Sequence, residues 1–191
     1  VSSVTFEAIE RIPEEIRASD RVLVWKAEER DGKSTKVPYE AGRPSRHAAV
    51  NDPDTWGRFD TALLNVEDGK ADGVGFVLGD GIVGVDLDDC RDPESGELEP
   101  WAEKIIAQVD SYTEISPSGT GVHVLARGVL PDGRRRRGNV EMYSDGRYFT
   151  VTGAHLDGTP EEIRERTAEL AALHAETFET NGGQEDRDSD S

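Results

Sequence analysis

The chain has one cysteine, one methionine and no long hydrophobic run among its 191 residues. The single cysteine, Cys90, excludes an internal disulfide and any multi-cysteine metal site. No apolar stretch approaches the ~18 residues that a transmembrane helix needs, and the N-terminal segment has none of the basic-then-apolar pattern of a signal peptide. We therefore expect a soluble, unexported protein in a reducing cytoplasm, with no membrane partner.

Lysine is also scarce, with 5 Lys and 17 Arg against 40 acidic residues, for a net charge of −18. The acidic residues are spread along the whole chain. A lysine-poor, acidic surface keeps a protein soluble in concentrated salt, where screening weakens self-repulsion. We expect a halophilic, salt-adapted cytoplasm, such as that of a haloarchaeon. Because high salt weakens long-range attraction to nucleic acid for every protein, this net charge does not exclude a nucleic-acid partner.

The apolar residues, 35% of the chain, fall in periodic clusters, which predicts one folded domain over residues 1–178 and a disordered acidic tail over residues 179–191. Helices are expected over residues 6–18 with a break at Pro13, 52–64, 100–109, and from 160 onward. Strands are expected over residues 22–25, 36–39, 74–78, 82–87, 112–115, 122–126, 140–143 and 148–152. Turns are expected at residues 31–32, at residues 79–81 as a second hairpin, and at residues 144–146, with residues 43–51 as loop. Strands and helices do not alternate regularly, which favours an α+β domain with mixed or antiparallel sheets flanked by helices.

Asp86 and Asp88 lie in the pattern Ile-Val-Gly-Val-Asp-Leu-Asp-Asp, which begins at Ile82. Side chains alternate along a strand, so both carboxylates point to the same face. Like charges placed this way destabilise a strand end unless a cation lies between them, and Mg²⁺ or Mn²⁺ prefers such oxygen ligands. The pattern is therefore either a metal site or an acidic turn on an acidic surface.

Residues 116–124 read Ser-Pro-Ser-Gly-Thr-Gly-Val-His-Val. Small residues around two glycines let backbone N–H groups approach a phosphate, and the following strand presents His123 on the face opposite its valine neighbours. An imidazole beside such a turn suits triphosphate binding. The alternative interpretation is an ordinary hairpin turn followed by one polar strand residue.

Glu141 alternates with apolar residues on the strand predicted over residues 140–143, and it adds a third carboxylate if that strand neighbours the first. Residues 127–147 contain six Arg against three acids, a local charge of +3. Four of these arginines are consecutive: Arg134, Arg135, Arg136 and Arg137. They form either a solvated loop tip or a set of phosphate contacts.

Together, these patterns resemble the primase-polymerase domain of viral and plasmid replication proteins, within the archaeo-eukaryotic primase superfamily. The resemblance rests on residues 84–90, 112–123, 141–143 and 147–153, with Trp25 and residues 36–39 upstream, and it covers roughly residues 20–155. Two positions depart from the usual pattern. A hydroxyl residue often stands two before the histidine, where this chain has Gly121, and the third acid is Glu141, where many relatives have Asp.

The resemblance implies a role for each matching residue. Asp86, Asp88 and Glu141 are expected to be catalytic and to bind two Mg²⁺ or Mn²⁺ ions. The incoming nucleotide is expected to contact His123, Ser118, Gly119, Thr120, Gly121, Lys36 and Arg147. DNA is expected to contact the four consecutive arginines.

We therefore expect a metal-dependent, template-directed nucleotidyltransferase, a DNA primase and DNA polymerase acting in the replication of a plasmid, virus or integrated element. Its partners would be template and primer DNA, a dNTP or NTP, and a helicase domain or protein. Two alternatives remain open: a non-catalytic DNA-binding module of a replication initiator, which would use the arginines while the acids are structural, and a two-metal nuclease, which would use the same carboxylates.

Overall fold

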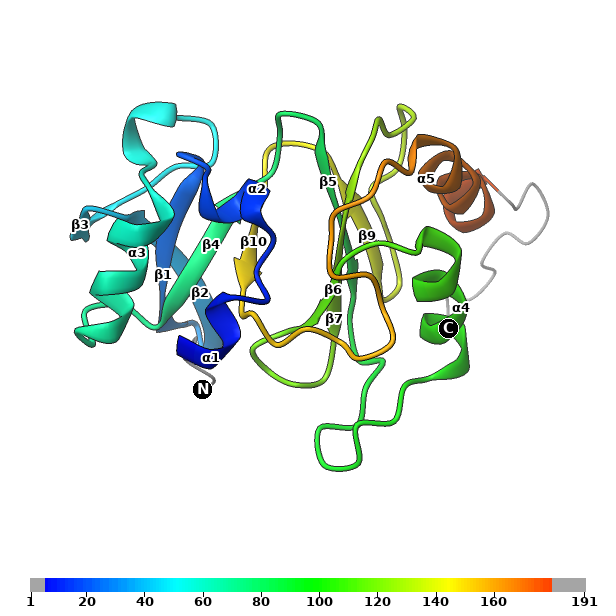
Figure 1. Ribbon diagram of the computed structural model, residues 1–191, viewed down its shortest axis with the longest axis horizontal. Coiled ribbons are helices and arrows are strands. Elements are labelled where there is room, and N and C mark those ends of the chain that lie inside the picture. The colour runs from blue at the N-terminus through cyan, green and yellow to red at the C-terminus, as the bar shows by residue number, and fades with distance from the viewer. Residues whose placement is uncertain (1–5, 180–191) are drawn as a thin grey trace, which may run out of the picture.

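Two antiparallel sheets of five strands each, with helices packed against them, form the computed structural model, which describes residues 6–179. The first sheet has the strand order β10-β4-β1-β2-β3 and the second has the order β6-β7-β5-β9-β8. Figure 1 shows the first sheet on the left and the second on the right. The predicted α+β class is confirmed.

The strands follow one another along the chain with these bounds: β1 Val22–Arg30, β2 Lys33–Glu40, β3 Arg43–His47, β4 Gly73–Val77, β5 Ile82–Leu87, β6 Thr113–Ile115, β7 Val122–Arg127, β8 Arg136–Arg137, β9 Val140–Tyr143 and β10 Tyr148–Val151. The helices are α1 Phe6–Ile9, α2 Glu14–Arg17, α3 Phe59–Glu67, α4 Pro100–Val109 and α5 Thr167–His174, with a 3-10 turn at Pro53–Thr55 and a π-helical turn at Ala175–Glu179. None of the described helices is long and apolar enough to cross a bilayer.

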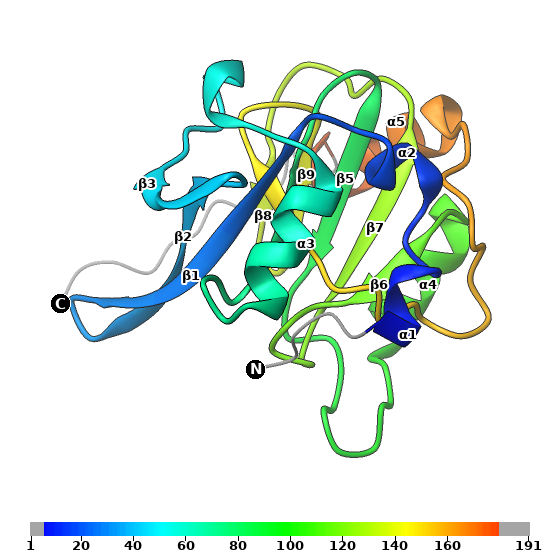
Figure 2. The same ribbon diagram turned by 60° about the vertical axis from the view of Figure 1, so that its left-hand side comes forward.

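Two hydrophobic cores hold these layers. One lies between the sheets and under α3, and it includes Val24, Phe59, Phe76, Leu125 and Phe149. The other packs α4 and α5 against the outer face of the second sheet, where the alternate residues of β5 are buried: Val83, Val85 and Leu87. Figure 2 shows α3 across the first sheet, with α4 and α5 beyond the second. The opposite face of β5 therefore points back toward the first sheet.

The hairpin predicted at residues 79–81 is wrong, because β4 and β5 belong to different sheets. β4 pairs with β1 and β10, whereas β5 pairs with β7 and β9. Positive φ angles at Gly79, Asp80 and Gly81 let the chain turn sharply from one sheet into the other. The turn between β9 and β10 carries the chain back from the second sheet to the first. The two connections between the sheets lie side by side, and Leu78 N donates to Arg147 O at 2.9 Å.

Three further predictions differ from the structure. Residues 43–47, expected as loop, form β3, which pairs with the C-terminal end of β2 at Tyr39 and Glu40. The helix expected over residues 52–64 is divided, because Gly57 forms two backbone hydrogen bonds with Val22, so α3 begins only at Phe59. The helix expected from residue 160 begins at Thr167, because Arg164 and Arg166 first pair with the backbone of Arg127.

The other predicted helices and strands are present, including the break at Pro13 between α1 and α2. Cys90 is a buried free thiol. Apart from Glu179, the predicted acidic tail lies outside the described residues.

Candidate active site

Asp86, His123 and Glu141 lie side by side on three neighbouring strands. Asp86 on β5 is the register partner of His123 on β7 and of Glu141 on β9. Directly opposed residues of antiparallel strands project from the same face of a sheet. The row continues outward to Glu114 on β6 and Arg136 on β8. Five strands thus place four titratable acid or imidazole side chains and one guanidinium in a line across one face.

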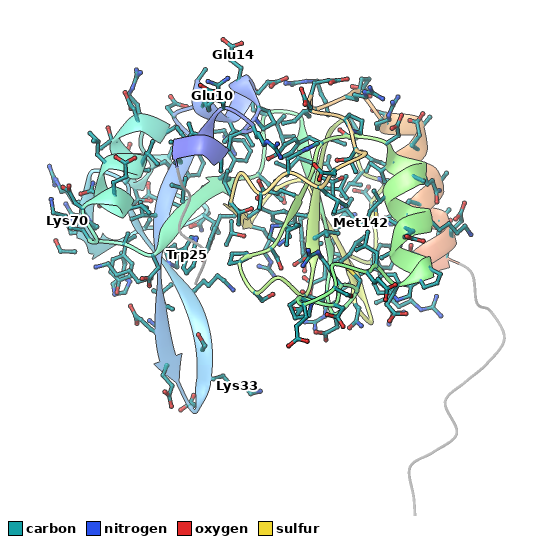
Figure 3. The ribbon with its side chains drawn as sticks, turned by 60° about the horizontal axis from the view of Figure 1, so that its bottom comes forward. Glu10, Glu14, Trp25, Lys33, Lys70 and Met142 are labelled. Carbon is teal, nitrogen blue, oxygen red and sulfur yellow. The ribbon has the colours of Figure 1, made fainter. Side chains whose placement is uncertain are left out.

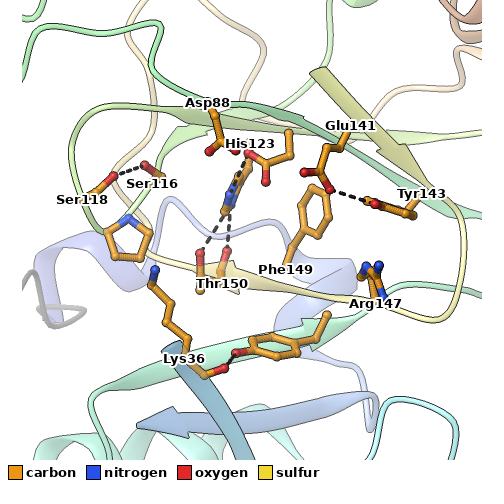
Figure 4. Close-up of a pocket in the computed structure, with 13 residues that line it drawn as sticks. Lys36, Asp88, Ser116, Ser118, His123, Glu141, Tyr143, Arg147, Phe149 and Thr150 are labelled. Carbon is orange, nitrogen blue, oxygen red and sulfur yellow. Dashed lines mark hydrogen bonds and ion pairs between the residues drawn. The ribbon is translucent and has the colours of Figure 1, made fainter. Parts of the chain in front are cut away.

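The three central residues of this row, Asp86, His123 and Glu141, form one side of a pocket of about 290 Å³, near the lower end of the range for small-molecule sites. The first sheet supplies the other side, so the pocket exists only where the two sheets meet. Figure 4 shows the arrangement. Its lining comprises Lys36, Asp86, Asp88, Ser116, Pro117, Ser118, His123, Glu141, Tyr143, Arg147, Tyr148, Phe149 and Thr150.

Asp86 is the electrostatic centre of the pocket. Burial first, and then the carboxylates of Asp88 and Glu141, raise the pKa of Asp86 to about 7, against the opposing charges of Lys36 and Arg136. Its Oδ1 is buried without a hydrogen-bond partner, and His123 Nε2 lies 3.5 Å from it. A buried carboxylate oxygen with no donor is costly, which makes a bound cation favourable here.

Glu141 is held in a fixed orientation by two neighbours. Tyr143 donates its hydroxyl to Glu141 Oε2 at 2.8 Å, and Arg136 Nε lies 3.2 Å from Oε1. Asp88 is exposed at the end of β5, with its backbone N–H bonded to Asn139 O. Residues 6–179 contain no three His, Cys, Asp or Glu side chains already gathered as a metal cage. The unpartnered Oδ1 and the oxygen-only donor set of the three carboxylates nevertheless fit a hard divalent cation.

His123 is buried at the back of the pocket between Asp86 and β10. Its Nδ1 lies 3.4 Å from both the backbone oxygen and the hydroxyl of Thr150, and its ring is tilted against Phe149 with centroids 4.9 Å apart. Burial lowers the pKa of His123, while the charge of Glu114 opposes that shift. The ring is thus fixed by packing, with Nε2 facing Asp86.

The turn over residues 116–121 carries linked hydroxyl groups at the pocket rim. Ser118 Oγ lies 3.1 Å from Ser116 Oγ and 2.8 Å from Thr120 Oγ1. Ser118 lines the pocket, whereas Gly119, Thr120 and Gly121 are outside its lining. A Cβ at Gly121 would lie 2.7 Å from Leu87 O. This close approach to β5 explains why the position two before the histidine bears no side chain.

The basic residues divide into two groups. Lys36 and Arg147 line the pocket, with the Arg147 guanidinium 4.8 Å from the centre of the Tyr143 ring. None of the four consecutive arginines lines it, and only Arg136 reaches the row through Glu141. Arg135 donates to Pro131 O, and Arg137 donates to Thr177 O.

Several pocket residues carry no role in the sequence-based prediction. They are Ser116, Pro117, Tyr143, Tyr148, Phe149 and Thr150. Tyr148, Phe149 and Thr150 come from β10, which belongs to the first sheet, so their place in the pocket depends on the packing of two sheets. The polar hydroxyl of Thr150 in an otherwise apolar strand was the one local sign.

Glu114 was missed although it lies next to His123 in the row. It is 1% exposed, and its carboxylate accepts from Thr152 N at 2.9 Å, Gly153 N at 3.1 Å and the Tyr112 hydroxyl at 2.9 Å. It therefore ties the end of β10 to β6 behind the imidazole.

Comparison with known proteins gives one informative match. No family model matches the chain. The chain is 37% identical over 162 residues to a protein from Nitratiruptor phage NrS-1 that is described as a DNA primase-polymerase. The aligned region covers 81% of this chain but 22% of the phage protein. The chain therefore spans about a fifth of the length of this relative.

Proposed function

We propose that this chain is the catalytic core of a DNA primase-polymerase, a metal-dependent and template-directed nucleotidyltransferase. The row of Asp86, His123 and Glu141 in one pocket carries the proposal. The similarity to the phage primase-polymerase supports it, as do the α+β architecture and the two antiparallel sheets. Membership of the archaeo-eukaryotic primase superfamily, with that superfamily's core fold, is part of the proposal.

Asp86, Asp88 and Glu141 would hold the divalent ions, Mg²⁺ or Mn²⁺. Such ions lower the pKa of a primer hydroxyl and neutralise charge on the departing pyrophosphate. The protein's own contribution is positioning. Glu141 is already oriented by Tyr143 and Arg136, and Asp86 has an oxygen free for a ligand.

The triphosphate of the incoming nucleotide would lie between His123, Ser118 and Lys36. Ser118 lies at the rim, His123 at the back, and Lys36 on the wall that the first sheet supplies, and each can donate a hydrogen bond, His123 when its Nε2 carries the proton. Donors fixed before the substrate arrives stabilise developing negative charge without reorganisation. Arg147 would contact a further phosphate, and the arginines of residues 134–137 would contact template or primer DNA.

The wider context is part of the same proposal. The acidic composition is consistent with a halophilic, haloarchaeal host. The phage origin of the relative is consistent with replication of a virus, plasmid or integrated element, and its much greater length leaves room for a helicase partner, as a domain or a separate protein.

Primer extension with labelled dNTPs or NTPs, run with Mg²⁺ and with Mn²⁺ at several salt concentrations, tests the proposal. The wild type should add nucleotides only with a divalent cation, and Asp86→Ala with Asp88→Ala should abolish addition. Glu94→Ala with Glu97→Ala is the matched control, because it removes two exposed carboxylates from a nearby loop and should leave addition unchanged.

The outcomes separate the candidate activities. Nucleotide addition by the double Asp variant contradicts the proposed metal site. DNA binding by the wild type with no addition under any condition favours a non-catalytic initiator module, and cleavage of the primer without addition favours a nuclease.

A further inference from the structure

The hairpin of β1 and β2 extends far beyond the sheet to which it belongs. β4 pairs with β1 only over Val22 to Trp25, and β3 pairs with β2 only at Tyr39 and Glu40. The remaining outer part, residues 26–37, is a two-stranded ribbon with five cross-strand pairs. Figure 3 shows it projecting from the body with Lys33 at its tip.

Lysine is concentrated in this ribbon. Three of the five lysines of the chain lie within residues 26–37, and with Arg30 they give four positive charges against Glu28, Glu29 and Asp31, a net +1 in a chain of −18. Glu28 is engaged by the Tyr39 hydroxyl and by Arg30 at 3.4 Å. Lys33 and Lys36 have no carboxylate within ion-pair distance in the described part of the chain.

The ribbon is stiffened on one face and open on the other. Lys26 lies 4.5 Å from the centre of the Tyr39 ring, on the same face as the contact between Glu28 and Tyr39. The opposite face carries Ala27, Glu29, Ser34 and Lys36, which are all exposed. An isolated hairpin is only marginally stable in water, so these contacts on one face support the ribbon outside the sheet.

Lys36 links the open face to the candidate active site. It lines the pocket, its Nζ lies 5.7 Å from the centre of the Trp25 ring, and its backbone oxygen accepts from the Tyr148 hydroxyl. The ribbon therefore starts at the pocket wall. Five residues per strand at ~3.3 Å each carry it roughly 16 Å outward, about the length of five base pairs.

We propose that this ribbon is a duplex-binding arm that contacts the primer–template helix as it leaves the pocket. The inference rests on the proposed function. A two-stranded ribbon fits a nucleic-acid groove, and phosphate contacts by exposed basic side chains set its position. Arg30 and Lys33 at the tip contact backbone phosphates of the duplex, while Lys36 at the base faces the nucleotide pocket.

DNA binding by Arg30→Gln with Lys33→Gln tests the arm. The matched control is Arg58→Gln with Lys104→Gln. Arg58, like Arg30, pairs with one carboxylate, and Lys104, like Lys33, is exposed with no carboxylate within ion-pair distance among residues 6–179. The probes are fluorescent hairpin-capped DNA stems of roughly 4 and 14 base pairs with the same single-stranded template overhang, which brackets the reach of the arm.

The wild type and the control should bind the long stem more tightly than the short one. At low salt, the arm variant should bind the long stem roughly tenfold more weakly than the wild type does, with no change on the short stem. The slope of its log affinity against log salt concentration should be shallower by about 2. Nucleotide addition on the short stem should match the wild type.

If the arm variant and the control lose the same affinity for DNA, or if the arm variant loses the same affinity for both stems, the proposed arm is wrong. A wild type that binds both stems equally does the same. If the wild type binds the long stem preferentially but adds no nucleotide, the proposed polymerase activity fails while the arm stands. If it binds neither stem, both proposals fail.

Discussion

The Phe149 ring fills the space that a side chain at position 84 would occupy. A Cβ on Gly84 would lie 2.4 Å from Phe149 Cε2, so β10 of the first sheet packs directly on the backbone of β5 in the second. The same ring contacts His123. Gly84 thus permits the sheet-to-sheet contact that closes the pocket beside Asp86.

Gly84→Ala should therefore destabilise the protein by about 1–3 kcal/mol, because overpacking forces Phe149 out of its place. Displacement of the ring should also loosen His123 and lower nucleotide affinity. Denaturant unfolding and nucleotide titration measure the two effects. Gly42→Ala is the control, since a Cβ there would meet only Thr61 Cγ2 at 3.8 Å. Equal stability of both variants would contradict this packing.

Asp86→Asn should stabilise the metal-free protein at neutral pH. Burial, with Asp88 and Glu141, raises the pKa of Asp86 from 3.8 to about 7, so the folded state keeps a proton that the unfolded chain releases near pH 4. Wild-type stability contributed by this group therefore falls as pH rises from about 4 to 7. The asparagine does not titrate, so the free energy of unfolding of the variant should rise relative to that of the wild type over this pH range, by on the order of a few kcal/mol.

Thermal unfolding in EDTA across pH 4–8 measures this difference. Asp89→Asn, which removes an exposed neighbouring carboxylate, serves as the control. A constant difference between Asp86→Asn and wild type at all pH values would mean that Asp86 titrates normally.

Glu114→Gln should destabilise the protein by roughly 2–3 kcal/mol. Each carboxylate oxygen accepts a backbone N–H, from Thr152 on one side and Gly153 on the other, so the amide of glutamine must face one of these donors. Denaturant unfolding measures the loss, with exposed Glu97→Gln as the control. A change of less than about 0.5 kcal/mol would show that the buried carboxylate is dispensable.

Ser118→Ala and Thr120→Ala should affect nucleotide binding differently. Ser118 lines the pocket, and Thr120 lies outside the lining although the two hydroxyls are 2.8 Å apart. We expect KM for the nucleoside triphosphate to rise roughly 10–100-fold in the Ser118 variant, the cost of one hydrogen bond to a charged group, and less than about twofold in the Thr120 variant. Steady-state primer extension measures both, and the reverse order would assign the triphosphate donor to Thr120.

Local patterns were sufficient for much of the fold. Alternation along β5 placed Asp86 and Asp88 opposite the buried valines, and turn residues marked most strand ends correctly. The failures share one cause. At each of the three places, the backbone pairs with a group that is distant in the sequence, and local propensity does not reveal that partner. The pairing involves residues 79–81 at the turn, Val22 before α3 and Arg127 before α5.

For the site, the sequence alone determined which side chains could hold a cation or a phosphate and that Asp86 and Asp88 share a face. Only the tertiary structure decided that His123, Asp86 and Glu141 stand in register, because register depends on long-range strand pairing. Only the packing of two sheets added Tyr148, Phe149 and Thr150 to the pocket and buried Glu114 behind it. Period-two alternation is a property of neighbouring residues, whereas the pocket is a property of two surfaces in contact.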